Sequence, residues 1–278
     1  MPELPEVAAH AERLHERYAG AALAGFTPLS FTALKTFEPP PDRAVGLTLS
    51  QVDHRGKHLL LRFGDLTFVV HLMQGGRLRE DTSKSRRPRG RVARWTFDDG
   101  RALLLTEAGT ERKAGIWVIA GDPHSVEPLT RLGPEADTVD AAALRQIAHD
   151  HRMRLHGLLR QQRLMAGLGR RLANEICHRA RMSPFQQSAR LDDDDADRIV
   201  ASIRSAVHED LESERARKDM SASRERPAAV HNRTGEPCPV CGDTVREVAY
   251  RAYTVHYCAT CQTGGKVLAD NTTSKFLK

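Results

Sequence analysis

The sequence predicts an α+β fold in which an antiparallel β domain is followed by helices and then by a small cysteine-rich module. Three patterns carry this prediction. Paired apolar strands separated by Gly- and Asp-containing turns fill the first half of the chain, apolar residues at helical spacing follow, and two Cys-x-x-Cys pairs lie near the end. The domains expected are residues 1–131, 132–233 and 234–265, with a tail at 266–278.

The first domain begins with a helix and continues as strands. Apolar residues recur at helical spacing from about residue 2 to residue 18, and Glu3 and Glu6 fall in the first turn, where the helix dipole favours acids. Residues 59–72 and 92–106 each contain two short apolar runs around a Gly/Asp turn, which is typical of hairpins. We therefore expect an antiparallel sandwich or barrel.

The β pattern ends at Leu132-Gly133-Pro134-Glu135, and four helices are expected after it. Asp140 can cap the first, residues 155–159 mark the second, the third begins at Arg170, and residues 199–207 mark the fourth. Residues 212–233 are polar and poor in large apolar side chains, which predicts a linker or loop.

Composition indicates a soluble globular protein. The 278 residues are 40% hydrophobic and 28% charged. No apolar run approaches the length that crosses a bilayer, and the acidic N-terminus lacks the basic-then-apolar layout of a signal peptide. A cytoplasmic location, away from the membrane, is therefore expected.

Positive charge is concentrated in two segments. The formal net charge is +6, residues 84–94 carry lysine and arginine without any acid, and residues 152–181 carry eight arginines against Glu175 alone. Such segments favour nucleic acid, because each neutralised phosphate releases condensed counterions. A GC-rich genome would also raise the arginine total, but it would not explain why acids cluster elsewhere, as at Asp192–Asp195.

The cysteine spacing predicts a metal site. Four of the five cysteines form two Cys-x-x-Cys pairs, Cys238 with Cys241 and Cys258 with Cys261. Each pair places two thiolates on one tight turn, and the segment between the pairs is long enough for a β-hairpin, so the four can surround one zinc ion. Four thiolates leave no open coordination position, which makes the zinc structural. A redox role for the pairs is the weaker alternative.

The loop Gly167-Leu168-Gly169 precedes the third predicted helix. Free backbone N–H groups at a helix N-terminus suit an anion, although a tight turn between two helices has the same pattern. Arg170 and Arg171, which follow directly, favour a DNA phosphate.

Pro2 would carry a free secondary amine once Met1 is removed. An α-amino group titrates at about 7.7–8.0, and a helix N-terminus disfavours its cationic form, so part of it would be neutral and nucleophilic. Glu3 is placed beside it to move protons. From these residues alone, a proline that merely begins a helix is the simpler interpretation.

Short motifs along nearly the whole chain resemble the formamidopyrimidine-DNA glycosylase/endonuclease VIII family. They follow in family order: Met1-Pro2-Glu3-Leu4-Pro5-Glu6-Val7, Arg55-Gly56-Lys57, His71-Leu72, Leu132-Gly133-Pro134-Glu135, Gly167-Leu168-Gly169 to Ala173-Asn174-Glu175, and Gly235-Glu236-Pro237-Cys238. The resemblance implies an N-terminal β-sandwich, a helix–two-turn–helix domain and a zinc-ribbon hairpin.

The resemblance also implies a base-excision-repair DNA glycosylase with AP lyase activity. By analogy, Pro2 attacks C1′ of a damaged nucleotide flipped out of the duplex, Glu3 is the general acid/base, and Lys57 contacts phosphate and assists proton transfer. The implied partner is damaged double-stranded DNA in the bacterial nucleoid, bound by a monomer. The implied DNA contacts are His71, Gln74, Arg112, Arg170, Asn174 and Arg251.

Several positions depart from the family pattern near the lesion. Gln74 stands where a methionine usually fills the gap left by the flipped base, and Ala114 replaces an aromatic residue close to Arg112. The loop that holds 8-oxoguanine in the purine-specific branch is not recognisable between Val207 and Thr234. A preference for 8-oxoguanine is therefore not expected.

Two departures affect the phosphate contacts. Arg170 replaces an asparagine, and its guanidinium can also contact the phosphate. Tyr253 stands where the hairpin arginine is usual, and Arg251, two residues away, could substitute for it only in a different hairpin register.

Two other functions fit part of the sequence. A damage- or abasic-site-binding protein of the same fold, with little base excision, would suit the substituted positions. A zinc-ribbon transcription factor would share the basic segments and the cysteines, but it gives no reason for Pro2-Glu3 and Lys57. Trapping of a Schiff base distinguishes the enzyme from the first alternative, and specific binding to undamaged DNA would favour the second.

Overall fold

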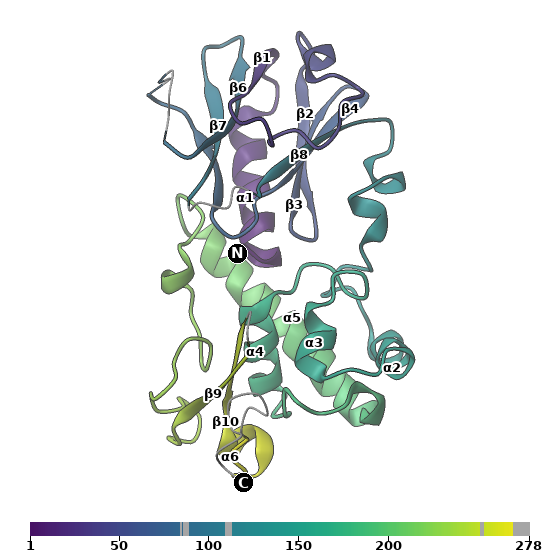
Figure 1. The fold of residues 1–278 in the computed structure, drawn as a ribbon, viewed down its shortest axis with the longest axis vertical. Coiled ribbons are helices and arrows are strands. Elements are labelled where there is room, and N and C mark those ends of the chain that lie inside the picture. The colour runs from purple at the N-terminus through teal and green to yellow at the C-terminus, as the bar shows by residue number, and fades with distance from the viewer. Residues whose placement is uncertain (84, 86–88, 109–112, 251–252, 269–278) are drawn as a thin grey trace. The chain divides into compact units, whose positions relative to one another are not determined.

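The computed structural model describes residues 1–83, 85, 89–108, 113–250 and 253–268 (Figure 1). The chain forms two compact units. Unit 1 comprises Met1–Leu132 and Glu214–Ser223, and unit 2 comprises Gly133–Ser213 and Arg224–Lys278. The finer division into 1–131, 132–233, 234–265 and a tail stays a prediction.

Unit 1 contains one long helix and two four-stranded antiparallel sheets. The sheets have the strand orders β1-β6-β7-β5 and β2-β3-β4-β8. The elements are α1 (Leu4–Tyr18), β1 (Leu23–Pro28), β2 (Leu49–Arg55), β3 (His58–Phe63), β4 (Leu66–His71), β5 (Gly76–Glu80), β6 (Arg91–Phe97), β7 (Ala102–Glu107) and β8 (Gly115–Ala120).

Both predicted hairpins are confirmed. Strands β3 and β4 pair from His58 opposite His71 to Phe63 opposite Leu66, and the turn between them uses Gly64 at φ 59°. Strands β6 and β7 pair up to Thr96 opposite Ala102. A positive φ at the turn is the conformation that glycine adopts without a steric cost, which explains why this turn could be read from the sequence.

The core of unit 1 lies between the two sheets. Phe26 and Trp95 of the first sheet meet Phe68 of the second, with ring centroids 5.3 Å apart for Phe26–Phe68 and 5.9 Å for Phe68–Trp95. Trp95 and Phe68 are fully buried. Burying each side chain of this size contributes about 1.5–3 kcal/mol, so the apolar alternation of the strands suffices to hold the sheets face to face. The predicted sandwich is confirmed.

Helix α1 packs against β2 and β3 and adds its own apolar face to this core. Val7, Leu14 and Tyr18 are at most 4% exposed. Their helical spacing places them on one side of the helix, so burial of that side fixes how the helix lies on the sheet.

Unit 2 is helical apart from one hairpin. Its elements are α2 (Ala141–Asp150), α3 (Leu155–Arg160), α4 (Arg170–Arg179), α5 (Asp193–Arg215), β9 (Val245–Ala249), β10 (Thr254–Cys258) and α6 (Ala259–Thr263). Helices α3 and α4 pack against each other, and β10 packs against α4. The last two residues of α5, Glu214 and Arg215, belong to unit 1.

Helix α5 continues to Arg215, so the expectation of a linker from residue 212 is wrong for its first residues. Arg215 explains the extension, because its guanidinium forms a bidentate ion pair with the carboxylate of Glu12. Polar residues therefore hold this part of the helix by pairing rather than by apolar burial.

Among the helices of the described residues, none has both the length and the apolar character needed to cross a membrane.

Candidate functional site

Pro2 and Glu3 are buried where α1 begins. Glu3 is the N-cap residue, and a capping box joins it to Glu6: each side chain accepts the other residue's backbone N–H. The Glu3 N–H donates to Oε2 of Glu6 at 2.5 Å. A carboxylate is thus held directly beside residue 2, at the end of the helix where the dipole is positive.

Lys57 lies in the tight turn between β2 and β3. Arg55 pairs with His58 across this turn, and Gly56 has φ 55°. Lys57 is only 5% exposed. Its ammonium group is therefore held on a rigid turn rather than on a mobile surface loop.

Two histidines lie beside Lys57. The rings of His58 and His71 have centroids 4.7 Å apart. Burial is the main reason that the pKa of His58 falls to about 3, and repulsion from His71 and Lys57 adds to it. Burial and the nearby Lys57 charge lower the pKa of His71 to about 4. Both rings are therefore neutral at physiological pH.

Hydrogen bonds indicate which nitrogen of each ring carries the proton. His71 Nδ1 accepts the backbone N–H of Met73 at 3.1 Å, so its proton is on Nε2. His58 Nδ1 donates to the carbonyl of Arg55 at 3.3 Å. His71 can therefore offer an N–H donor beside the Lys57 ammonium.

Gln74 is exposed in the short loop between β4 and β5. The residue before it, Met73, has φ 52°, and a Cβ at Gly76 would lie 2.0 Å from the carbonyl oxygen of Leu72. The backbone of this loop therefore has little freedom, and the side chain of Gln74 points into solvent.

The Gly167-Leu168-Gly169 loop of unit 2 is held by Gln162. The Gln162 amide donates to the carbonyls of Arg160 and Leu168, both at 2.8 Å, and accepts the N–H of Gly167 at 3.1 Å. Gly169 is the N-cap of α4, and Arg170 is its first residue and is partly exposed. The structure therefore has a helix N-terminus with an arginine in its first turn at this loop, and binding of an anion there stays a prediction.

Asn174 is fully buried in α4 and joins the helix to the hairpin. Its side-chain oxygen accepts the N–H of His256 at 3.3 Å, and its amide nitrogen lies 2.8 Å from Nδ1 of His231. The side chain positions β10 against α4, and a direct contact of Asn174 with DNA stays a prediction.

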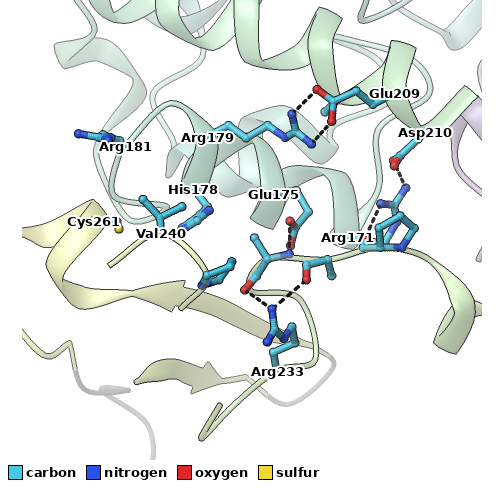
Figure 2. A pocket seen from close by; sticks show the side chains of 15 residues that line it. Arg171, Glu175, His178, Arg179, Arg181, Glu209, Asp210, Arg233, Val240 and Cys261 are labelled. Atoms are coloured by element: carbon cyan, nitrogen blue, oxygen red, sulfur yellow. Dashed lines mark hydrogen bonds and ion pairs between the residues drawn. The ribbon is translucent and has the colours of Figure 1, made fainter. Parts of the chain in front are cut away.

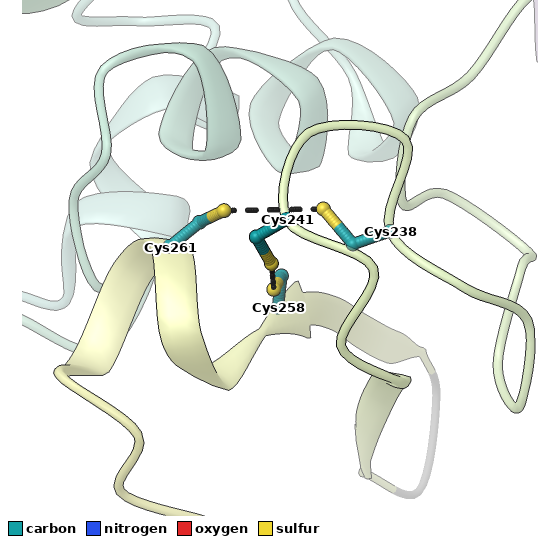
Figure 3. Close-up of side chains that lie close together, drawn as sticks. All are labelled: Cys238, Cys241, Cys258 and Cys261. Atoms are coloured by element: carbon teal, nitrogen blue, oxygen red, sulfur yellow. Dashed lines mark hydrogen bonds between the residues drawn. The ribbon is translucent and has the colours of Figure 1, made fainter.

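The four predicted ligands come together at the base of the hairpin (Figure 3). All four sulfurs lie within 4.8 Å of one another, with Cys238–Cys261 at 3.9 Å and Cys241–Cys258 at 3.3 Å. Zn–S bonds of about 2.3 Å in a tetrahedron put sulfurs roughly 3.8 Å apart, so the cluster fits one zinc ion. The four thiolates hold one structural zinc.

Neighbouring residues of unit 2 hold the four cysteines in place. Nε2 of His178 lies 3.3 Å from the sulfur of Cys238. Gln262 accepts the N–H of Cys258 at 2.8 Å and donates to the carbonyl of Met182 at 3.0 Å. Cys177 is buried in α4 and is not part of the ligand set, and burial raises the pKa of its thiol.

A cavity of about 510 Å³ lies between α4, α5 and the segment before the hairpin (Figure 2). Glu175 reaches across and accepts the backbone N–H groups of Ala229, Val230 and His231 at 2.7, 3.1 and 2.9 Å. The arginines that line it are engaged in part, since Arg179 forms a bidentate pair with Glu209. The cavity therefore belongs to the scaffold that supports the hairpin.

The roles of Glu175, His178 and His58 were not found from the sequence. Each contacts a partner that no local spacing could reveal, because the contact depends on how the chain folds. Arg112 and Arg251, two predicted DNA contacts, lie outside the described residues.

Comparisons with known proteins agree with this architecture. Residues 1–116 match the formamidopyrimidine-DNA glycosylase N-terminal domain, and residues 235–264 match the zinc finger found in FPG and IleRS. A formamidopyrimidine-DNA glycosylase of Thermus thermophilus is 32% identical over 289 residues, covering 95% of this chain and 100% of that protein.

A second relative and a solved structure are also similar to this chain. An uncharacterized formamidopyrimidine-DNA glycosylase-like protein of Mycobacterium tuberculosis is 36% identical over 149 residues, which is 53% of this chain and 94% of that protein. The crystal structure of a MutM (FPG) protein from Thermus thermophilus matches with a TM-score of 0.82 at 27% identity, covering 96% of this chain and 100% of that one.

Proposed function

The chain belongs to the formamidopyrimidine-DNA glycosylase family, whose members are bifunctional DNA glycosylases and AP lyases of base-excision repair, and we propose that its nucleophile is the amine of Pro2. The observation that carries this proposal is the placement of Glu3. Its buried carboxylate is held by the capping box beside residue 2, where removal of Met1 would expose the amine.

The proposed reaction begins with the neutral Pro2 amine. Its lone pair forms a bond to C1′ of the damaged nucleotide, the glycosidic bond breaks, and the base leaves with the bonding electrons and takes a proton from water. The Pro2 nitrogen, now positively charged, gives its N–H proton to the Glu3 carboxylate. Glu3 then passes this proton to the sugar ring oxygen as the ring opens, and the nitrogen lone pair forms the iminium at C1′. Loss of a C2′ proton then expels the 3′ phosphate and cuts the strand.

The remaining residues act on the DNA in this proposal. Lys57 contributes a positive charge to a phosphate near the reacting sugar, and His71 offers the N–H that its tautomer leaves available. Gln74 fills the space left by the flipped base. Arg170 and the N-terminus of α4 bind a second phosphate, and Asn174 supports them through the hairpin. The protein acts as a monomer on duplex DNA in the bacterial nucleoid.

Borohydride trapping on a duplex with an abasic site tests the nucleophile. Reduction of the iminium should link the protein covalently to DNA, and the cross-linked peptide should begin at residue 2. Pro2→Gly should lower the trapping rate by roughly ten-fold or more, because the secondary amine is lost. Lys57→Ala should cross-link more slowly but through the same peptide. Unchanged trapping by Pro2→Gly would refute the role of Pro2.

A panel of duplexes tests the lesion. Duplexes with 8-oxoguanine opposite cytosine, an oxidised pyrimidine or an abasic site are compared for base release and strand cutting. We expect 8-oxoguanine to be a poor substrate beside the abasic site, because Gln74 and the segment 207–234 lack the purine-specific pattern. Equal or faster turnover of 8-oxoguanine would contradict this expectation.

A further inference from the structure

Tyr253 lies in an aromatic stack at the tip of the zinc hairpin. Its ring is parallel within 20° to that of Tyr250, with centroids 4.9 Å apart. It is also stacked at 19° with the ring of His156, 6.0 Å away on α3. The N–H of Tyr250 donates to the carbonyl of Tyr253 at 2.8 Å, next to the Ala249–Thr254 pair of the hairpin. The stack thus attaches the hairpin tip to α3.

Arg160 adds a cation to this stack. It is the last residue of α3, and its guanidinium carbon lies 4.3 Å from the centroid of the Tyr253 ring. A guanidinium at this distance is attracted to the negative face of the ring. Stacking of this kind uses the flat face of a guanidinium, and the N–H groups in the plane of a guanidinium match the oxygens of a phosphate.

The stack lies next to the loop that begins α4. One amide, that of Gln162, donates to the carbonyl of Arg160 and to the carbonyl of Leu168, both at 2.8 Å. The loop residue Gly169 caps α4, and Arg170 follows. The segment from Arg152 to Asn174 contains no acidic residue in the sequence. Two arginines and a helix N-terminus therefore lie within one short, rigid part of unit 2.

We propose that Arg160, oriented by the ring of Tyr253, binds a phosphate of the DNA strand beside the Gly167-Leu168-Gly169 loop. The proposal rests on the proposed function for the presence of DNA. Arg160 is a binding residue, and Tyr253 is a positioning residue that holds its guanidinium. The zinc hairpin then contributes to DNA binding through an aromatic ring that aligns a cation from a neighbouring helix.

The affinity for an abasic-site duplex, measured at several salt concentrations, tests this proposal. Arg160→Ala should weaken binding about ten-fold at low salt and reduce the slope of log K against log[salt] by about 0.9, the value for one lost phosphate contact. Tyr253→Leu should weaken binding less, because the cation stays but is no longer held. Tyr253→Phe should behave like the wild type, since it keeps the ring face.

A rescue separates binding from packing. Tyr253→Arg, introduced into Arg160→Ala, places a guanidinium on the hairpin and should restore the lost slope. Arg145→Ala is the matched control, because Arg145 of unit 2 already pairs with Asp193 at 3.1 Å and should leave the slope unchanged. Zinc content and melting temperature should be the same in all variants, which excludes loss of the fold.

Two results would overturn the proposal: a slope unchanged by Arg160→Ala, or a Tyr253→Leu protein that binds like the wild type. Schiff-base trapping by the wild type is measured in parallel and reports on the Pro2 reaction alone. A wild type that binds with the Arg160-dependent slope but does not trap would refute the proposed chemistry and leave the phosphate contact standing. A wild type that forms the Schiff-base cross-link, but whose salt dependence does not change on loss of Arg160, would refute the phosphate contact and leave the Pro2 reaction standing.

Discussion

Glu3 illustrates how a single residue serves the fold and the proposed chemistry together. Its exchange of hydrogen bonds with Glu6 satisfies N–H groups that the first turn of α1 would otherwise leave without partners. The same contacts hold its carboxylate beside residue 2. Removing the carboxylate would therefore affect both the start of the helix and the proton transfer, so Glu3→Gln is the informative change, since it keeps a hydrogen-bonding side chain.

Histidines of unit 1 whose pKa values are lowered by burial couple its stability to pH, and His71, with a pKa of about 4, is one of them. His10 donates to the carbonyl of Leu78, and burial lowers its pKa to about 4, while burial lowers the pKa of His58 to about 3. Both values lie below the ordinary value of about 6.5 in the unfolded chain. Between these limits the unfolded chain binds more protons than the folded one, so the free energy of unfolding falls as the pH falls.

His58→Phe should reduce this pH dependence. The wild type should be insensitive above about pH 7 and lose up to ~1.4 kcal/mol per pH unit for each such histidine between pH 6.5 and pH 4. The variant keeps a ring but cannot bind the proton. The slope of its free energy of unfolding against pH should therefore be smaller by the contribution of one histidine. Denaturant unfolding at several pH values measures this. His124→Phe, at an exposed position, should keep the wild-type slope, and a His58→Phe slope equal to it would contradict the assignment.

At the scale of a single element, the stability of the zinc hairpin depends on partners that are distant in the sequence. Strands β9 and β10 form only five paired positions, from Thr254 opposite Ala249 to Cys258 opposite Val245. So short a hairpin cannot be stable through its own burial, and its stability comes from the zinc and from the contacts with α4. His178 of α4 takes part directly, since it lies 3.3 Å from the Cys238 sulfur.

His178→Phe should make zinc easier to remove. An N–H donor to a thiolate stabilises its negative charge and orients it, and loss of such a contact typically costs 10- to 100-fold in metal affinity. We expect release of zinc to a coloured chelator to be about ten-fold faster in the variant. His178→Gln, which keeps a donor, should lie between the variant and the wild type. His208→Phe, at an exposed position of α5, is the control and should not change the rate.

At the scale of the whole molecule, the chain divides the proposed nucleophile and the zinc site between its two compact units. Unit 1 depends on apolar burial between two sheets, with fully buried Phe63, Phe68 and Trp95. Unit 2 also buries apolar side chains, such as Leu158, Leu172 and Ile203, and it adds polar connections, such as the Arg171–Asp210 pair and the carboxylate of Glu175 on three backbone N–H groups. The proposed nucleophile lies in the first, and the zinc lies in the second.

Zinc removal should therefore affect the unfolding of unit 2 and not that of unit 1. Treatment with a strong chelator should lower the melting temperature of unit 2 or abolish its unfolding transition. The unfolding transition of unit 1 should stay unchanged, because the metal stabilises unit 2 alone. Binding to abasic-site DNA should fall at least about ten-fold and return when zinc is added back. Calorimetry and a binding titration measure both effects. Undiminished binding by protein shown to be free of metal would contradict the role given to the hairpin.

Local chemistry explains what could be predicted. The hairpins followed from turn residues such as Gly64, and the metal site followed from two Cys-x-x-Cys pairs, because in each case the residues that act together are neighbours in the chain. The position of Pro2 and Glu3 at a helix start followed from the same kind of local pattern. The end of α5 could not be predicted, because Arg215 is held by Glu12, a partner 203 residues away.

The sequence by itself determined the sandwich strands, the zinc ligands and the family, since turn conformation, ligand spacing and short motifs depend on neighbours in the chain. Only the tertiary structure decided which residues act on one another across it. It placed His178 on a zinc ligand, His58 beside His71, and Arg160 on the ring of Tyr253. The physical reason is that burial, stacking and ion pairing depend on distance in space, and only the folded chain brings such partners together.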